Sequence, residues 1–270
     1  MMAEFSVDGV QIHYDVSGTA ARHLILVHAY PVHSAVWSPQ VAALSNDRTV
    51  VTYDVRGFGR SAAPDNPAFY SQDRSVADLL ALLDHLGLQQ ADICGLSMGG
   101  NIALNFALGH PDRVSSLVVS GTGSGSDDPK PFIERTNGWA EMAERRGMGA
   151  FADLVMLNGV FSEYADRGAR ERAHLRGLIL GNTVPGVAHT ARRVIAKRPT
   201  IRQLEPRLKE LPVRTLIIAG ELDPAVALPT QIMAETIPSA RLEIIPGTGH
   251  FNNVEVPDTV NRLLRDFLLG

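Results

Sequence analysis

The sequence has few of the features that mark secreted, membrane-spanning or nucleic-acid-binding chains. A single cysteine, Cys94, stands among 270 residues, so we expect no internal disulfide and favour a reducing, cytoplasmic location. No apolar run approaches the roughly 20 residues of a membrane span, and the first residues do not resemble a signal peptide. With 25 Lys and Arg against 29 Asp and Glu, the net charge is −4, which argues against nucleic acid as a partner. We expect no membrane partner either.

What the chain does contain is a globular composition, 45% hydrophobic and 20% charged, with alternating strand and helix patterns. Two short segments flank Asp8-Gly9, a pair typical of a hairpin turn. Short apolar segments bounded by turn signals are typical of buried strands. On this basis we predict eight strands, at residues 4–7, 11–16, 23–28, 48–54, 91–96, 116–121, 213–219 and 241–246.

Between these strands, apolar residues recur at helical spacing. They recur at intervals of three and four from Val76 to Leu86, and Gly87 is placed to end that helix. Further helices are predicted over residues 98–108 and from Pro257 to Leu268. A hairpin followed by strand–helix alternation predicts an α/β fold, with an eight-stranded, mostly parallel sheet and helices on both faces.

Residues 123–205 interrupt this alternation. The segment opens with Gly and Ser, contains no convincing strand and has several helical stretches. It holds 13 Lys and Arg against 10 Asp and Glu, net +3, whereas the rest of the chain holds 12 against 19, net −7. We interpret residues 123–205 as a helical cap inserted after the sixth strand, and residues 1–122 with 206–270 as the core domain. We interpret the positive charge of this segment as that of helix faces exposed to solvent. The alternative hypothesis is that the charge favours substrates that bear a carboxylate.

Residues 95–99, with the sequence GLSMG, match the pattern G-x-S-x-G between a predicted strand and a predicted helix. A sharp turn there presents the central hydroxyl, that of Ser97, above the sheet, and small neighbours let the turn close. The helix N-terminus supplies N–H groups and positive charge for an oxyanion. The pattern therefore predicts Ser97 as a nucleophile, whereas Cys94 fits a small buried hydrophobe better than a second nucleophile.

On these residues the chain resembles the α/β-hydrolase fold superfamily, and its elbow GLSMGG resembles those of serine esterases, enol-lactonases and haloperoxidase-like perhydrolases. The resemblance implies a serine elbow after the fifth strand, a helical cap after the sixth, and the chain order Ser, Asp or Glu, His. Haloalkane dehalogenases and epoxide hydrolases share the fold but use Asp at the elbow, so Ser97 argues against both. No metal-binding spacing is present, and we expect no metal and no cofactor.

A base and an acid are expected downstream of Ser97, because a neutral serine is a weak nucleophile. His250 lies in a Gly-rich loop after the last predicted strand, from which its side chain can reach the carboxyl edge of the sheet. We expect His250 to be the base, rather than the histidines at the end of the elbow helix or in the cap: His110, His174 and His189.

The expected acid is Asp223, which follows the predicted strand 213–219 by a few residues. In an open α/β sheet, that position lies at the carboxyl edge, where sites form. Glu221 is two residues away and is the alternative. The G-x-x-D pattern that the resemblance implies favours Asp223, which would fix the tautomer of His250 and stabilise its charged form.

The resemblance also implies an oxyanion hole made by two backbone N–H groups, those of Met98 and Tyr30. The loop HAYP resembles the pattern H-G-x-P, with Ala29 in place of the usual glycine. Residues 54–61, DVRGFGRS, resemble D-x-R-G-x-G-x-S, where we expect Arg56 to form an ion pair that supports the site. Aromatic candidates for the substrate pocket, or alternatively for ordinary packing, are Trp37, Trp139, Phe151 and Phe161.

These residues favour a serine hydrolase that cleaves a small carboxylic ester or lactone through an acyl-enzyme on Ser97. A C–C bond hydrolase and a cofactor-free perhydrolase with the same three residues are alternatives, as is a non-catalytic receptor for a small ligand. The expected partner is a small-molecule substrate, and the sequence leaves a homo-oligomer open.

Overall fold

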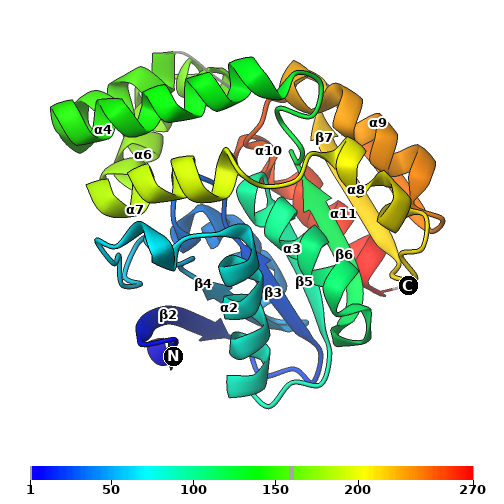
Figure 1. Cartoon of the computed structure of the whole chain (residues 1–270). Coiled ribbons are helices and arrows are strands. Elements are labelled where there is room, and N and C mark those ends of the chain that lie inside the picture. The colour runs from blue at the N-terminus through cyan, green and yellow to red at the C-terminus, as the bar shows by residue number, and fades with distance from the viewer. Residues whose placement is uncertain (1, 158–160, 270) are drawn as a thin grey trace.

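The computed structural model describes residues 2–157 and 161–269, so residues 1, 158–160 and 270 of the expected domains lie outside it. Its eight strands form a sheet in the order β1-β2-β4-β3-β5-β6-β7-β8 (Figure 1). All eight predicted strands are found: β1 (Met2–Val7), β2 (Val10–Ser17), β3 (His23–Val27), β4 (Thr49–Tyr53), β5 (Ala91–Leu96), β6 (Val114–Ser120), β7 (Thr215–Gly220) and β8 (Ala240–Ile245). The predicted α/β fold is confirmed.

Strand direction follows from the connections. β1 and β2 form the predicted antiparallel hairpin, with Val7 opposite Val10. Asp8 and Gly9 between them have φ values of 50° and 75°, which suit a tight hairpin turn. β2 is also antiparallel to β4, whereas β4, β3, β5, β6, β7 and β8 pair in parallel. The central strands are continuously buried because helices cover both faces.

Helices of the core pack on the two faces of this sheet. Figure 1 shows α2 and α3 in front of the sheet and α11 behind it. The core helices are α1 (Ser38–Leu44), α2 (Gln72–His85), α3 (Met98–Gly109), α9 (Ala227–Thr236), α10 (Asn252–Glu255) and α11 (Pro257–Leu269), with single turns η1 (Ser34–Trp37), η2 (Pro67–Phe69), η3 (Pro111–Arg113) and η5 (Pro224–Val226). The Ser71 hydroxyl caps α2 by accepting the Arg74 N–H, and Gly87 with φ 68° follows its end, as predicted.

The expected helical insertion follows β6. Figure 1 shows α4, α6 and α7 lying across one end of the sheet. The helices of this segment are α4 (Pro129–Leu157), which is interrupted at Gly147, α5 (Ser162–Ala165), α6 (Ala169–Leu180), α7 (Val184–His189), the π-helical η4 (Thr190–Ile195) and α8 (Ile201–Leu208). α8 runs across the boundary we expect between residues 205 and 206 and packs against α9. The domain limits stay a prediction.

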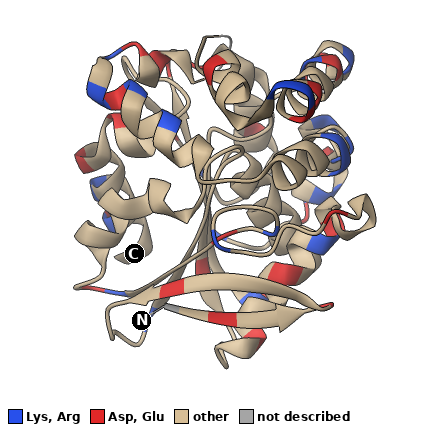
Figure 2. Cartoon of the chain, turned by 90° about the vertical axis from the view of Figure 1, so that its left-hand side faces the viewer, with Lys and Arg blue, Asp and Glu red and all other residues tan. Residues whose placement is uncertain are grey.

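The inserted segment, residues 123–205, carries charged side chains of both signs. In Figure 2 the helices at the top carry blue and red segments close together. Several of its arginines form exposed ion pairs with acids of the same segment, namely Arg172–Asp166, Arg176–Asp153 and Arg192–Glu144. Such pairs fit solvated helix faces. Within the described ranges, none of the helices is both long and apolar enough to cross a membrane.

Arg56 forms the ion pair expected of it. Its Nε donates to Asp78 Oδ2 at 2.8 Å, its Nη2 donates to Oδ1 at 2.5 Å, and its Nη1 donates to the Phe69 carbonyl at 2.9 Å. Both charged side chains are buried. Burial raises the pKa of Asp78, against the opposing effect of Arg56. The pair joins the loop after β4 to α2, beside the carboxyl edge of the sheet.

We expect the variant Arg56→Leu to lose about 3–5 kcal/mol of unfolding free energy, because it leaves the Asp78 carboxylate buried without a partner. The double variant Arg56→Leu/Asp78→Leu removes both charges and should regain most of that loss. Urea unfolding of the two variants and the parent chain measures both effects. A double variant no more stable than the single one would contradict the buried-pair explanation.

Candidate active site

Ser97 stands at a strained turn between β5 and α3. Its φ of 54° and ψ of −110° are rare for a residue with a side chain. The turn closes only because its neighbours lack side chains: a Cβ on Gly95 would lie 2.2 Å from the Gly99 carbonyl oxygen, and one on Gly99 would lie 2.1 Å from that of Val27. The turn thus has the strained strand-to-helix geometry predicted for the elbow.

Hydrogen bonds fix the elbow on both sides. The Ser97 N–H donates to the Ser120 carbonyl at 2.8 Å, at the end of β6. The Asn101 N–H and its side-chain amide both donate to the Ser97 carbonyl, each at 3.1 Å. The backbone is therefore held, while the partly exposed Ser97 side chain faces a cavity that it shares with His250.

His250 and Asp223 meet at the same edge of the sheet. His250 Nδ1–H donates to Asp223 Oδ2 at 2.5 Å, and both side chains are almost completely buried. With its hydrogen on Nδ1, the neutral ring keeps Nε2 free to accept a proton. Glu221 points elsewhere: it is exposed, and its carboxylate accepts the Gly247 N–H at 2.9 Å. The structure thus brings Asp223, not Glu221, to His250.

The three other candidate histidines are not among the described residues that line this cavity. The ring of His110 packs near Phe106, His174 Nδ1 pairs with the Tyr164 hydroxyl at 2.8 Å, and His189 Nε2 donates to the Asp65 carbonyl at 2.9 Å.

Glu255, which the sequence did not single out, braces the His250 loop. Its carboxylate accepts the N–H groups on either side of His250, those of Gly249 at 2.8 Å and Phe251 at 3.0 Å. Arg167 of the cap donates to the same carboxylate at 2.7 Å and to the Glu255 carbonyl at 2.9 Å. A glutamate just ahead of a helix is too common to signal this role from sequence. The contacts hold the His250 loop and tie it to the cap.

The two expected oxyanion donors line the cavity beside Ser97. Met98 begins α3, so its N–H has no acceptor within the helix. Tyr30 follows β3, and no acceptor in the described part of the chain takes its N–H. Its buried ring stacks on Trp139 of the cap, with 5.9 Å between the ring centroids. Both residues border the cavity, and their role as oxyanion donors stays a prediction.

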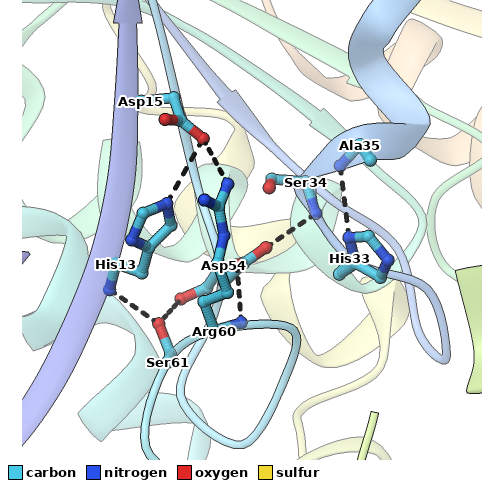
Figure 3. A network of polar contacts seen from close by, with 8 residues as sticks. All are labelled: His13, Asp15, His33, Ser34, Ala35, Asp54, Arg60 and Ser61. Atoms are coloured by element: carbon cyan, nitrogen blue, oxygen red, sulfur yellow. Dashed lines mark hydrogen bonds and ion pairs between the residues drawn. The ribbon is translucent and has the colours of Figure 1, made fainter. Parts of the chain in front are cut away.

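A polar network supports the loop that carries Tyr30. Figure 3 shows Asp54, which follows β4, accepting the Ser34 N–H and the Arg60 N–H, each at 2.9 Å. The Ser61 hydroxyl donates to the Asp54 carbonyl at 2.5 Å and accepts the His13 N–H at 2.9 Å. Burial alone raises the pKa of Asp54, but the surrounding polar groups, including these N–H donors, outweigh it and lower the pKa.

His28, inside the core, is hydrogen-bonded both to the loop after β3 and to the loop after β4. Its Nδ1–H donates to the Ala29 carbonyl at 2.9 Å, and its Nε2 accepts the Val55 N–H at 2.9 Å. Complete burial lowers the pKa of His28 to about 4. The ring is therefore neutral at pH 7, and both of its nitrogens are used to hold backbone.

The His28 contacts predict a pH dependence of stability. The folded pKa, about 4, lies below the ordinary 6.5, so the stabilisation is fully present above pH 6.5 and is lost as the pH falls towards 4. The loss amounts to about 3 kcal/mol. We expect His28→Gln to be less stable at pH 7 but to lose less between pH 7 and 4.5, as measured by urea unfolding.

The matched control is His23→Gln, at the partly exposed start of β3, which should keep the parental pH dependence. An unchanged pH dependence in His28→Gln would contradict the assignment.

Six of the residues expected from sequence line one cavity: Tyr30, Ser97, Met98, Trp139, Phe161 and His250. Phe161 packs edge-on against His250 at 5.8 Å between ring centroids. The other two aromatic candidates are not among the described lining residues. Trp37 is buried in η1. Phe151 packs edge-on against the ring of Tyr30, which itself lines the cavity.

The sequence did not single out five other residues of the wall, namely Ser124, Phe132, Arg135, Ile195 and Arg198. The cavity measures about 30 Å³, room for one or two waters. A larger substrate needs more room than this cavity offers in the structure.

Comparison with known proteins places this geometry in a family. The family model described as the alpha/beta hydrolase fold matches residues 22–152. The putative carbamate hydrolase RutD of Caulobacter segnis is 34% identical, with both chains covered completely. The chain belongs to the α/β hydrolase fold family. The resemblance inferred from sequence is confirmed, and so is the expected assignment of this α/β hydrolase as a hydrolytic enzyme.

Other relatives of this α/β hydrolase carry different names. A putative 2-succinyl-6-hydroxy-2,4-cyclohexadiene-1-carboxylate synthase of Bacillus subtilis is 30% identical, covering 97% of this chain and 96% of its own. The crystal structure of an enol-lactonase from Burkholderia xenovorans superposes with a TM-score of 0.85 at 29% identity, covering 99% of this chain and all of the other. These relatives are named for different reactions.

Proposed function

We propose that this α/β hydrolase cleaves a small carboxylic ester or lactone through an acyl-enzyme on Ser97. The observation that carries the proposal is that His250, which lines the same cavity as the strained Ser97, is hydrogen-bonded to Asp223 behind it. A nucleophile, a base with a free Nε2 and an acid that orients the base are the parts that acyl transfer needs.

In the first half-reaction, Ser97 Oγ attacks the carbonyl carbon while His250 Nε2 takes the hydroxyl proton. The carbonyl oxygen becomes an oxyanion and accepts the N–H groups of Tyr30 and Met98. The bond between the carbonyl carbon and the alcohol oxygen then breaks, and His250 returns its proton to that oxygen. A simple ester releases the alcohol, whereas a lactone keeps the hydroxyl on its acyl chain.

In the second half-reaction, water replaces the alcohol. His250 Nε2 takes a proton from the water as its oxygen bonds to the acyl carbon, and the oxyanion forms again. The acyl–Oγ bond breaks, Ser97 recovers its proton from His250, and the carboxylic acid leaves. Asp223 stabilises the imidazolium in both halves and stays ionised.

A carbamate is the second candidate substrate, favoured by the 34% identity to a protein named as a putative carbamate hydrolase. The same attack on a carbonyl carbon serves both substrates. C–C bond hydrolysis, perhydrolysis and ligand sensing remain alternatives on the same residues. The single buried cysteine keeps a cytoplasmic location as our expectation.

Turnover of p-nitrophenyl butyrate, of small lactones and of aryl carbamates tests the proposal. Turnover of esters or lactones supports it, and turnover of carbamates alone supports the second candidate. Binding of these compounds without turnover of any of them would contradict the proposal and favour a receptor.

A further inference from the structure

Two arginines stand in the wall of the Ser97 cavity. Arg135 comes from α4, and Arg198 comes from the turn after η4. None of the described residues that line the cavity carries a carboxylate. The space above the nucleophile is therefore bordered by positive charge.

Arg198 uses only part of its donor capacity. Its Nη2 donates to the Ser124 carbonyl at 2.9 Å, and its guanidinium carbon lies 5.4 Å from the centre of the Phe132 ring. Among the described residues, no carboxylate lies within ion-pair distance of it. Arg192, on the preceding η4, is instead paired with Glu144. Arg198 thus differs from the solvated, paired arginines of the cap.

Arg135 continues the same positive wall. Its guanidinium carbon lies 5.5 Å from the centre of the Phe132 ring and 5.6 Å from that of Trp139. Phe132 therefore contacts both arginines, and Trp139 in turn stacks on Tyr30 beside Ser97. Arg135 is exposed, whereas Arg198 is partly buried, so the two mark an outer and an inner position along the cavity.

An unpaired guanidinium in a partly buried wall is costly unless an anion meets it. Burial lowers the pKa of Arg198 to about 10, so the group still carries its charge at neutral pH. A guanidinium presents N–H donors in a planar fork, which matches the two oxygens of a carboxylate.

We propose that Arg198, with Arg135 at its outer side, forms a carboxylate subsite beside Ser97, so that the substrate is an ester or lactone bearing a separate carboxylate group. The inference rests on the proposed function, because it names the substrate class of the same site. It also gives the positive charge of residues 123–205 a specific use at these two side chains.

A binding experiment tests the subsite without relying on turnover. In the Ser97→Ala background, we expect monomethyl glutarate to bind at least about 10-fold more tightly than dimethyl glutarate, as measured by calorimetry. Adding Arg198→Gln should remove this preference, and Arg198→Lys should restore part of it. Arg193→Gln removes an exposed charge on η4 and should leave the preference intact. Equal binding of the two esters to the Ser97→Ala chain would overturn the subsite.

A kinetic experiment asks the same question of the working enzyme. We expect the ratio of kcat/KM for mono-p-nitrophenyl glutarate to that for p-nitrophenyl valerate to fall about 10- to 100-fold in Arg198→Gln. The ratio should fall less in Arg135→Gln and stay unchanged in Arg193→Gln. An equal loss on both esters would assign Arg198 a structural role and overturn the subsite.

The two experiments separate the two claims. Selective binding of monomethyl glutarate without turnover of any ester would refute the proposed function and leave the carboxylate subsite standing. Turnover of both esters with equal efficiency would support the function and refute the subsite.

Discussion

The variant Ser97→Ala should lose at least about 10⁴-fold in kcat for ester hydrolysis. The loss is large because the hydroxyl forms the bond to the acyl group, and no described cavity-lining side chain other than Ser124 offers a second hydroxyl of this type. The Tyr30 and Met98 N–H groups remain in the variant, so a weak residual rate above that of water is expected. Steady-state kinetics with p-nitrophenyl butyrate measure the effect.

Ser124→Ala is the matched control for this prediction. It removes a serine hydroxyl from the same cavity wall but from a residue outside the elbow, and it should keep kcat within about 10-fold of the parent. Both variants should unfold at nearly the parental temperature, because truncation at partly exposed positions removes little packing. A Ser97→Ala chain as active as Ser124→Ala would contradict the assignment of the nucleophile.

The variant Asp223→Asn should lose about 10⁴-fold in kcat, although it changes almost no volume. A carboxylate accepts the His250 Nδ1–H, whereas an amide can present its NH₂ to Nδ1 and make that nitrogen the acceptor. The ring then carries its hydrogen on Nε2 and cannot take the Ser97 proton. The loss should fall mainly on kcat, since Asp223 lies behind His250 and outside the cavity lining.

Glu221→Gln serves as the matched control for the acid. It makes the same change two residues away, on an exposed side chain that contacts Gly247 rather than His250. We expect an effect smaller than about 3-fold, in keeping with ordinary surface substitutions. A larger loss in Glu221→Gln than in Asp223→Asn would reverse the assignment.

Much of the fold could be predicted because its signals are local. The central strands are continuously apolar, and the turn at Asp8-Gly9 needs only two residues to specify it. α1 and α9 are not predicted. α1 has seven residues, about two turns, so an apolar stripe cannot repeat often enough to stand out. α9 carries Pro229 in its first turn, where a missing N–H is tolerated although proline usually signals a break.

Ser97 could be predicted as the nucleophile for the same reason. It is adjoined in sequence by a strand, the glycines of the elbow and a helix. The acid is harder, because Asp223 and Glu221 leave the same strand two residues apart. Only the path of the loop decides which one meets His250. The hydrogen bonds of Glu221 and Leu222 to residues of the 245–248 segment set that path.

Pocket residues depend on packing between distant segments, which spacing does not reveal. Trp37 and Trp139 are equally plausible aromatic candidates in the sequence, yet only Trp139 lines the cavity. In the sequence, Arg198 follows Arg192, Arg193 and Lys197, a pattern typical of a helix face exposed to solvent. Only the structure shows that Arg198 lines the cavity, whereas Arg192 pairs with Glu144 and Arg193 is exposed.

The most direct test of the central claim is labelling by a fluorophosphonate, which reacts with an activated serine and mimics the tetrahedral intermediate. The proposed mechanism predicts one adduct per chain, mapped by mass spectrometry to Ser97, together with complete loss of esterase activity. Labelling should vanish in Ser97→Ala and slow strongly in His250→Gln. An adduct on another residue, or full activity in a chain labelled at Ser97, would contradict it.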